Sequence, residues 1–402
     1  MENTSNASAE KASGSTGSDW AGTVPQPAMT PDVTVVVPCY NVEKYLAQCL
    51  SSILENTRAV LEVIAVNDGS PDGSLAVMKS FAARDPRVHV IDKPNGGYGM
   101  AVNAGLANAH GTYVAVVEPD DYVRPHFYDH TVAFARSFET LPDVVKTPYL
   151  RITMPDTPKE RTYYCAYYDR LRPPHQPFTI AEVPRLLQHH PSIWSALYRR
   201  AFLEEKGIRF MEVPGAGWVD NPFLVETLCQ ASSIVYLNTP YYCYREDLPG
   251  SSSMLRSTLL GFERWHQMLD IIERLGIDDP RVLAAHYVRG FTYMGGALEA
   301  ADAQSSDEVS RAMASMVARM DPKLVLVSRY LDGNRKRMFC RLRGIEGASW
   351  SELPHLGSLA DEFVYSLRTN GLGFAASRVG MYFARKLHIK ANDPTKTASA
   401  GI

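Results

Sequence analysis

Short apolar runs alternate with amphipathic stretches along the first third of the chain. The runs are rich in β-branched residues, as expected of strands that are covered on both faces. They span residues 33–37, 61–68, 87–92 and 112–118. Between them, apolar residues recur at helical spacing, and we expect Asn41 to cap the first of these helices. Strands and helices that alternate at such short intervals predict parallel β-α units and an α/β fold.

The pattern changes in the second half of the chain. Further strands are predicted over residues 192–200, 208–210 and 233–246. A helix is predicted over residues 221–230, with Pro222 suited to its first turn. Beyond about residue 255 the periodicity is mainly helical. We therefore expect an α/β domain over 32–254, with halves at about 32–150 and 151–254, and a helical region over 255–390.

Composition narrows the class of protein. Residues 1–31 are rich in Ser, Thr, Ala and Gly and lack the basic start and apolar core of a signal peptide, so they predict a disordered tail, as do residues 391–402. No apolar stretch is long enough for a membrane span. A net charge of −3 without an extended basic run argues against a nucleic-acid partner. The six cysteines form no C-x-x-C pair, which favours reduced thiols and a cytoplasmic location.

Carboxylates follow two of the predicted strands. Asp68 closes the second strand, and Glu118, Asp120 and Asp121 follow the fourth, with a proline between the first two. In parallel sheets, ligands bind beyond the carboxyl ends of the strands. Three adjacent anions repel one another, so we expect a positive partner, although a solvated turn remains the simpler alternative.

Four segments in this order resemble the nucleotide-sugar half of a family 2 glycosyltransferase with the Rossmann-like GT-A fold. They are VVVPCYNVEKYLAQCLSSIL, VIAVNDGSPDGS, NGGYGMAVNAGL and VVEPDDYV, and the resemblance covers roughly residues 33–250. It implies an inverting transferase that moves a sugar from a nucleotide-sugar, here expected to be a UDP-sugar, to an acceptor hydroxyl. Synthesis of a cell-surface or extracellular polysaccharide or glycoconjugate is the expected setting.

The resemblance implies donor contacts in the first two segments. Asp68 would accept a hydrogen bond from a pyrimidine base, with Pro38 and Tyr40 lining the base-binding turn and Glu43 nearby. From the residues alone, Asp68 could instead be a turn residue that bonds its own backbone, and Tyr40 could be a core aromatic.

The glycine-rich segment NGGYGMAVNAG only partly matches the dinucleotide-binding motif G-x-G-x-x-G. Gly97 and Gly99 fit the first two glycines of G-x-G-x-x-G, but Val102 occupies the third position, which disfavours a dehydrogenase. We expect the glycines to allow close approach of the sugar-nucleotide. Asn95, Gly97 and Asn103 are the expected donor contacts here, although the family often has an arginine where Val102 stands.

Glu118-Pro119-Asp120-Asp121 resembles the D-x-D site of the family, with Glu in the first place. Carboxylate oxygens bind Mn²⁺ or Mg²⁺, which also bridges diphosphate oxygens. Asp120 is the first choice of metal ligand and Asp121 the second, and Glu118 would contact the ribose or a bound water. Arg245 would pair with the diphosphate, unless it forms only a surface salt bridge.

The acceptor side needs a base for the hydroxyl group. The resemblance implies that Asp220, after the glycine-rich loop GAG, is this base, although Val219 replaces the acid that usually precedes it. Asp220 could instead cap a helix, a role that Asn221 could also fill. Trp194 and Trp218 are candidate platforms for an acceptor sugar, or else core residues. The histidines of HHPS (189–192) are further candidates for acceptor contact.

The C-terminal stretch 373–390 combines basic and apolar residues on one predicted helix. It could lie on the inner face of the plasma membrane near a lipid-linked acceptor, or pack on its own protein with the cations outward, which we favour. Two other functions compete with the transferase: a non-catalytic nucleotide-sugar-binding module, and a nucleotidyltransferase, which the lack of a phosphate loop disfavours. The sequence does not determine the oligomeric state.

Overall fold

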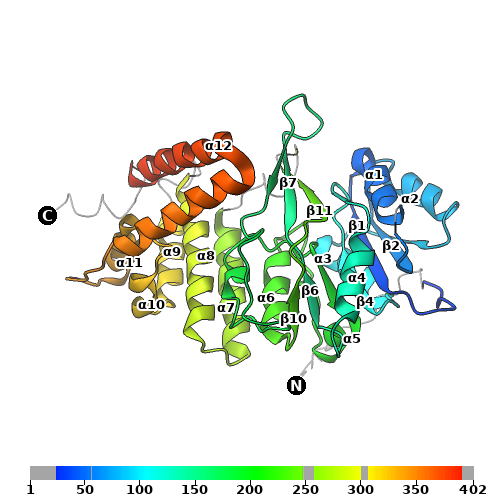
Figure 1. Cartoon of the computed structure of the whole chain (residues 1–402), viewed down its shortest axis with the longest axis horizontal. Helices are drawn as coiled ribbons and strands as arrows, with labels where there is room; N and C mark the ends of the chain where they lie inside the picture. The colour runs from blue at the N-terminus through cyan, green and yellow to red at the C-terminus, as the bar shows by residue number, and fades with distance from the viewer. Residues whose placement is uncertain (1–23, 56, 247, 249–257, 300–306, 392–402) are drawn as a thin grey trace, which may run out of the picture.

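A computed structural model describes residues 24–55, 57–246, 248, 258–299 and 307–391 (Figure 1). Within these residues, a seven-stranded sheet has the order β10-β6-β9-β4-β1-β2-β3 and a four-stranded sheet has the order β5-β11-β7-β8. The large sheet contains β1 (Val33–Cys39), β2 (Leu61–Asp68), β3 (Val88–Lys93), β4 (Tyr113–Val116), β6 (Val144–Lys146), β9 (Ala196–Arg199) and β10 (Ile234–Tyr236). The small sheet contains β5 (Tyr122–Val123), β7 (Tyr149–Thr153), β8 (Arg161–Tyr164) and β11 (Tyr242–Arg245).

Helices surround the large sheet and then continue beyond it. Those of the α/β part are α1 (Glu43–Leu54), α2 (Ser74–Ala82), α3 (Tyr98–Ala107), α4 (Phe127–Arg136), the 3-10 helix η1 (Pro184–Leu187), α5 (Arg200–Glu205) and α6 (Asp220–Gln230). Those of the helical region are α7 (Thr258–Arg274), α8 (Pro280–Glu299), α9 (Asp307–Ala318), α10 (Pro322–Val327), α11 (Gly333–Arg343) and α12 (Leu353–Ala391). Figure 1 shows α1 and α2 at one end of the molecule and the helical region at the other.

The predicted parallel strands are confirmed, and they gather the polar strand ends at one edge. β4, β1, β2 and β3 are neighbours and all parallel, with Val33 opposite both Leu61 and Tyr113. Carboxyl ends of parallel neighbours meet at the same edge, so Asp68 and Glu118 share it. The sheet is mixed, because β9 lies antiparallel between β4 and β6.

Two local predictions are wrong. No strand forms over 208–210, because the backbone N–H of Phe210 donates to the side-chain amide of Asn103, which in turn donates to the Phe210 carbonyl, each over 2.9 Å. Asn41 does not cap α1, which begins at Glu43. The amide of Val42 donates instead to the hydroxyl of Ser74, the first residue of α2, and the amide of Glu43 donates to Asp72 in the loop before it. That loop therefore replaces the expected local cap.

The helical region and the α/β part share one hydrophobic core. Buried side chains of the helical region, such as Trp265, Phe291 and Phe339, belong to the same contiguous cluster as the strands of the large sheet. The guanidinium of Arg264, on α7, donates to the Gly217 carbonyl over 2.7 Å. The predicted tails over 1–31 and 391–402 lie mostly outside the described residues, but Val24 is described and packs into the core.

The long helix α12 bends at Gly371, whose φ of 81° interrupts the helical backbone. Beyond the bend, the Phe374 ring packs on Tyr163 at 4.5 Å between centroids, while Leu372 and Phe383 are exposed. The membrane contact that the C-terminal sequence suggests therefore stays a prediction. Among the described residues, no helix is long and apolar enough to cross a membrane.

The glycine-rich segment at the start of α3 is covered by another part of the chain. The Tyr98 amide donates to the Gly215 carbonyl over 2.9 Å. A Cβ atom on Gly99 would overlap the carbonyl oxygen of Met211, and one on Gly97 would lie 2.9 Å from the Gly215 nitrogen. The close backbone approach that these glycines permit is thus to residues 211–215, which lead directly to α6.

This packing predicts that Gly99→Ala destabilises the fold. The added methyl group has no space beside the Met211 backbone, so we expect the free energy of unfolding to fall by about 1–3 kcal/mol in chemical denaturation. Gly296→Ala is the matched control, since nothing lies within 4 Å of its Cβ position inside α8, and it should be neutral or stabilising by up to about 1 kcal/mol. Equal effects of both changes would contradict the close approach.

Candidate functional site

A cavity of about 490 Å³ lies where the carboxyl end of β4 meets the helical region. It brings Glu118 and Asp120 together with Trp194, Trp218 and Asp220, which the sequence analysis had assigned to separate roles. Its volume is within the range of small-molecule sites. The cavity is also lined by Tyr98, Gln188, His189, His190, Asn221, Tyr244, Arg289 and Tyr293.

Glu118 contributes a carboxyl group with a strongly shifted pKa to this cavity. Burial raises the pKa of its carboxyl to about 8, and the nearby carboxylates of Asp120 and Asp220 add to the rise. The Tyr98 hydroxyl donates to Glu118 Oε1 over 2.6 Å, which partly opposes it. The folded chain thus holds acidic groups close together without enough positive charge to balance them.

The two predicted metal ligands differ in what they face. Asp120 lines the cavity, and burial raises the pKa of its carboxyl. Asp121 is buried, and its two carboxylate oxygens accept hydrogen bonds from the Tyr242 hydroxyl over 2.9 Å and from the Arg245 amide over 2.7 Å. Glu118 and Asp120 are therefore the carboxylates that a bound cation could reach from the cavity.

These residues fit a divalent cation that arrives with its substrate. Carboxylate oxygens suit Mg²⁺ or Mn²⁺, and the raised pKa values of Glu118 and Asp120 mark a place where positive charge would be stabilising. Among the described residues, no three His, Cys, Asp or Glu side chains lie close enough to hold a metal ion on their own. The remaining ligands would have to be water or substrate oxygens.

Asp220 is the first residue of α6, and the preceding Val219 is the N-cap residue, with no side-chain cap bond. The Asn221 side-chain amide donates to Asp220 Oδ1 over 2.9 Å. Burial raises the pKa of the Asp220 carboxyl, and Arg289 opposes the rise. A helix N-terminus favours the ionised form of a carboxyl group, but at Asp220 burial outweighs that effect. The capping alternative is wrong for both Asp220 and Asn221, because Val219 is the N-cap residue and Asn221 Oδ1 accepts hydrogen bonds from helix α8 instead.

Helix α8 contributes a polar cluster that the sequence analysis missed. The Tyr293 hydroxyl donates to Asn221 Oδ1 over 2.8 Å, and the Arg289 guanidinium donates to the same oxygen. Arg289 is buried and also donates to the Leu187 carbonyl over 3.2 Å. Ala285, Arg289 and Tyr293 recur every fourth residue on one face of α8. An arginine on an otherwise apolar face of a helix is the sequence feature that could have indicated a role for α8 in the site.

The two tryptophans line the cavity from different settings. Trp194 is buried and stacks on Tyr242 with 4.0 Å between ring centroids and on Tyr244 with 5.2 Å. It is thus both a core residue and part of the cavity wall. Trp218 has a φ of 50°, and its ring lies near that of Tyr293 at 6.3 Å. His190 also lines the cavity, next to Trp194.

Most of the expected donor-binding residues lie at the edge of the large sheet rather than in this cavity. Pro38 ends β1 together with Cys39, and Asn95 is exposed in the loop after β3. Tyr40 is 52% exposed, so the alternative that it is a core aromatic is wrong. Glu43 accepts a hydrogen bond from the Gly73 amide over 2.8 Å, which joins two adjacent loops at this edge.

Asp68 organises the loop that leads to α3. It is buried, pairs with Lys93, and accepts hydrogen bonds from the amides of Gly96 and Gly97, each over 2.9 Å. These contacts hold the glycine-rich segment against the end of β2.

Asn103 and Arg245 position loops around the site. Asn103 donates to the Phe210 carbonyl and, over 3.0 Å, to the Glu212 carboxylate. Arg245 is buried, donates to the Asp120 carbonyl over 2.5 Å and lies over the Tyr122 ring at 4.8 Å. The surface salt bridge proposed as an alternative for Arg245 is therefore wrong.

Comparison with known proteins adds independent findings. The model of the family described as "Glycosyl transferase family 2" matches residues 34–206. EpsJ of Bacillus subtilis, described as an uncharacterized glycosyltransferase, is 32% identical over 231 residues, which are 54% of this chain and 62% of EpsJ. Glycosyltransferase GlyA of Streptococcus pneumoniae is 28% identical over 218 residues, 53% of this chain and 30% of GlyA. The chain thus spans less than two thirds of each of these relatives.

A solved structure resembles the fold over a larger part of the chain. Residues 1–349 of S. aureus TarS superpose with a TM-score of 0.61 at 18% identity, covering 79% of this chain and 88% of that one. At this identity the resemblance concerns the fold. It extends past the residues that the family model matches and includes part of the helical region.

The raised pKa of Glu118 predicts a pH-dependent cost to stability. Because the folded protein keeps this proton up to about pH 8 and an unfolded carboxyl releases it near 4.5, the free energy of unfolding should fall as pH rises through that window. Glu118→Gln keeps an acceptor for Tyr98 but does not titrate. Between pH 5 and pH 8, denaturation should show the wild type losing about 3–4 kcal/mol relative to this variant. Parallel pH profiles would contradict the assignment.

Proposed function

Residues 34–206 belong to glycosyl transferase family 2 and the chain has the GT-A fold, and from this we propose that the protein transfers a sugar from a nucleotide-sugar donor to an acceptor hydroxyl. One observation carries the proposal: the Glu118 and Asp120 carboxylates and the Asp220 carboxylate line the same cavity. Glu118 and Asp120 suit a cation that is bound together with a diphosphate. Asp220 suits the role of general base for the acceptor hydroxyl. Synthesis of a surface polysaccharide or glycoconjugate is the proposed setting.

The proposed donor is a UDP-sugar. S. aureus TarS has been crystallised with UDP-GlcNAc and with UDP, which makes UDP-GlcNAc the first donor to test. Tyr40 and Asn95 are exposed at the carboxyl edge of the parallel strands and are available to the base and ribose. Asp68 would accept a hydrogen bond from the nucleobase only if it gave up one of the hydrogen bonds that it now accepts from the amides of Gly96 and Gly97. Otherwise its role is to hold the loop that leads to α3.

Asp120 and Glu118 would hold a divalent cation, Mn²⁺ or Mg²⁺, with the donor diphosphate. When bound, such a cation acts as a Lewis acid that neutralises charge on the departing nucleoside diphosphate. Arg245 holds the Asp120 backbone in place. Its guanidinium donates to the Asp120 carbonyl, and its amide donates to the Asp121 carboxylate. Tyr98 orients the Glu118 carboxylate.

Asp220 is the proposed general base. It would take the proton of the acceptor hydroxyl while that oxygen bonds to the anomeric carbon and the bond from this carbon to the diphosphate breaks, which inverts the configuration. A base works best when its pKa approaches the working pH, and burial moves the pKa of Asp220 in that direction. Trp194 and Trp218 would stack on the acceptor sugar.

Asp220→Asn should abolish transfer while leaving donor binding largely intact, because it removes the base and keeps the shape. We expect kcat to fall at least about 100-fold with UDP release as the readout, and the affinity for UDP-sugar to stay within about 3-fold. Asp307→Asn is the matched control: the same chemical change at the first residue of α9, which lines no cavity of the site. Retained turnover in Asp220→Asn would exclude this base, and no product from the wild type with any acceptor would favour a non-catalytic binding module.

The two aspartates after β4 should separate metal binding from folding. Asp120→Asn removes a charged ligand from the cavity, so calorimetry should show that Mn²⁺ no longer tightens UDP binding. Asp121→Asn places an amide where two donors need acceptors, and should lower the free energy of unfolding by about 1–3 kcal/mol while the Mn²⁺ effect persists. A normal Mn²⁺ effect in Asp120→Asn would contradict the proposed ligand.

A further inference from the structure

A second cavity, of about 420 Å³, adjoins the first and is lined by five arginines. These come from separate parts of the chain: a loop after β8, the helix η1, the start of α8 and the segment after α10. They are Arg170, Arg172, Arg185, Arg281 and Arg329. Gln188 lines both cavities, so the two are neighbours across one residue. We call this second cavity the arginine cavity.

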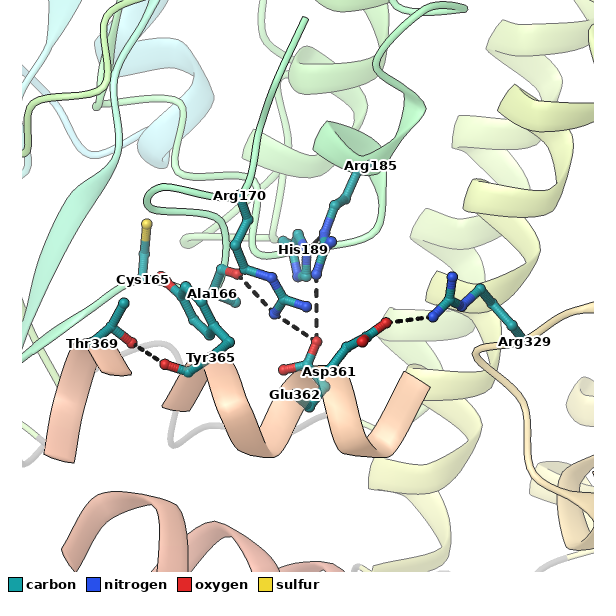
Figure 2. Close-up of polar contacts among 10 residues, drawn as sticks. All are labelled: Cys165, Ala166, Arg170, Arg185, His189, Arg329, Asp361, Glu362, Tyr365 and Thr369. Carbon is teal, nitrogen blue, oxygen red and sulfur yellow. Dashed lines mark hydrogen bonds and ion pairs between the residues drawn. The ribbon is translucent and has the colours of Figure 1, made fainter. Parts of the chain in front are cut away.

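Acidic residues offset only part of this charge. Two carboxylates of α12 reach the arginines, as Figure 2 shows: Glu362 pairs with Arg170 at 2.6 Å and with Arg185 at 3.4 Å, and Asp361 pairs with Arg329 at 2.5 Å. The single acidic residue in the lining, Glu182, pairs with His175 at 2.7 Å. Arg281 pairs at 2.7 Å with Asp279, which lies outside the lining.

Two of the arginines, Arg172 and Arg185, lack a carboxylate partner of their own among the described residues. Arg185 shares Glu362 with Arg170, and burial together with the Arg170 charge lowers the pKa of its guanidinium. Arg172 is exposed, and within the described part of the chain it forms no ion pair. Guanidinium groups gathered in this way favour an anion with several oxygen acceptors.

The arginine cavity is also linked to the reaction cavity through His189. The Arg185 Nε–H donates to His189 Nε2 over 3.3 Å, and His189 lines the first cavity. Burial and the surrounding arginines lower the pKa of His189 to about 3, so the imidazole is neutral and can accept this bond. An anion held by Arg185 would thus lie next to the wall of the reaction cavity.

We propose that the arginine cavity binds a phosphate group of the acceptor, and this rests on the proposed transferase function. The planar fork of arginine pairs with two phosphate oxygens at once, and several forks around one cavity match a tetrahedral anion. With its phosphate held there, the acceptor extends past Gln188 into the reaction cavity, where its hydroxyl meets Asp220. The proposal covers phosphate on a soluble glycan and phosphate in a lipid headgroup.

Binding of methyl phosphate to the full-length protein tests the site by calorimetry. Arg172→Gln combined with Arg281→Gln removes two of the five charges without touching the arginines that hold α12 or His189, and should weaken binding about 10-fold or more. Arg311→Gln is the control, since this exposed arginine of α9 lines neither cavity, and it should bind as the wild type does. Unchanged affinity in the double variant would overturn the proposal.

Two further arms locate the phosphate and separate this proposal from the general function. The first arm measures binding to phosphatidylglycerol vesicles, with phosphatidylcholine vesicles as the reference. If the double variant loses vesicle binding, the phosphate belongs to a lipid headgroup. If only its binding of methyl phosphate falls, the phosphate belongs to a soluble group. UDP-sugar binding with Mn²⁺ should remain within about 3-fold in the double variant. If donor binding is normal and neither phosphate probe responds, the acceptor proposal fails and the transferase survives. If the wild type binds no donor, the transferase proposal fails first.

Discussion

The site depends on the close packing of two backbones, that of Gly97–Gly99 against that of residues 211–215. Since a side chain at Gly99 would overlap the Met211 carbonyl, the contact requires glycine there, and Asn103 extends it by bonding both backbone groups of Phe210. This contact joins the carboxyl edge of the parallel strands to the loop that leads to α6. The carboxylates after β4 and Asp220 are about 100 residues apart in the sequence, and this contact helps to bring them to one cavity.

Charge in the protein is distributed in two unequal groups around the neighbouring cavities. The first cavity concentrates carboxylates whose pKa values are raised by burial, and the second concentrates guanidinium groups that share too few carboxylates. Each group is costly to a folded protein on its own, because clustered like charges repel one another and those that are buried also lose hydration. Both costs are offset when a ligand of opposite charge binds, so the arrangement suits the proposed transfer of a sugar from a cation-bound diphosphate to an anionic acceptor.

The parallel strands and the acidic residues at their ends could be predicted from the sequence, because β-branched runs and strand-end carboxylates are local patterns. The prediction weakened where a residue's partner is distant in the chain. Asn103 and Arg245 occupy positions expected to touch the donor, yet each bonds a loop that only the folded structure brings near. Arg289 and Tyr293 could not be assigned to the site, since their contact with Asn221 spans about 70 residues and follows from how α8 packs.

The position of Asp220 also changes how this chain should be compared with its relatives. The family match ends at residue 206, whereas Asp220, Asn221 and the α8 residues that fix Asn221 all come later. The region that the family model describes therefore ends before the part of the cavity that contains Asp220. A protein that matches this model equally well need not share Asp220 or its neighbours on α8, so the match by itself carries no information about this wall of the cavity.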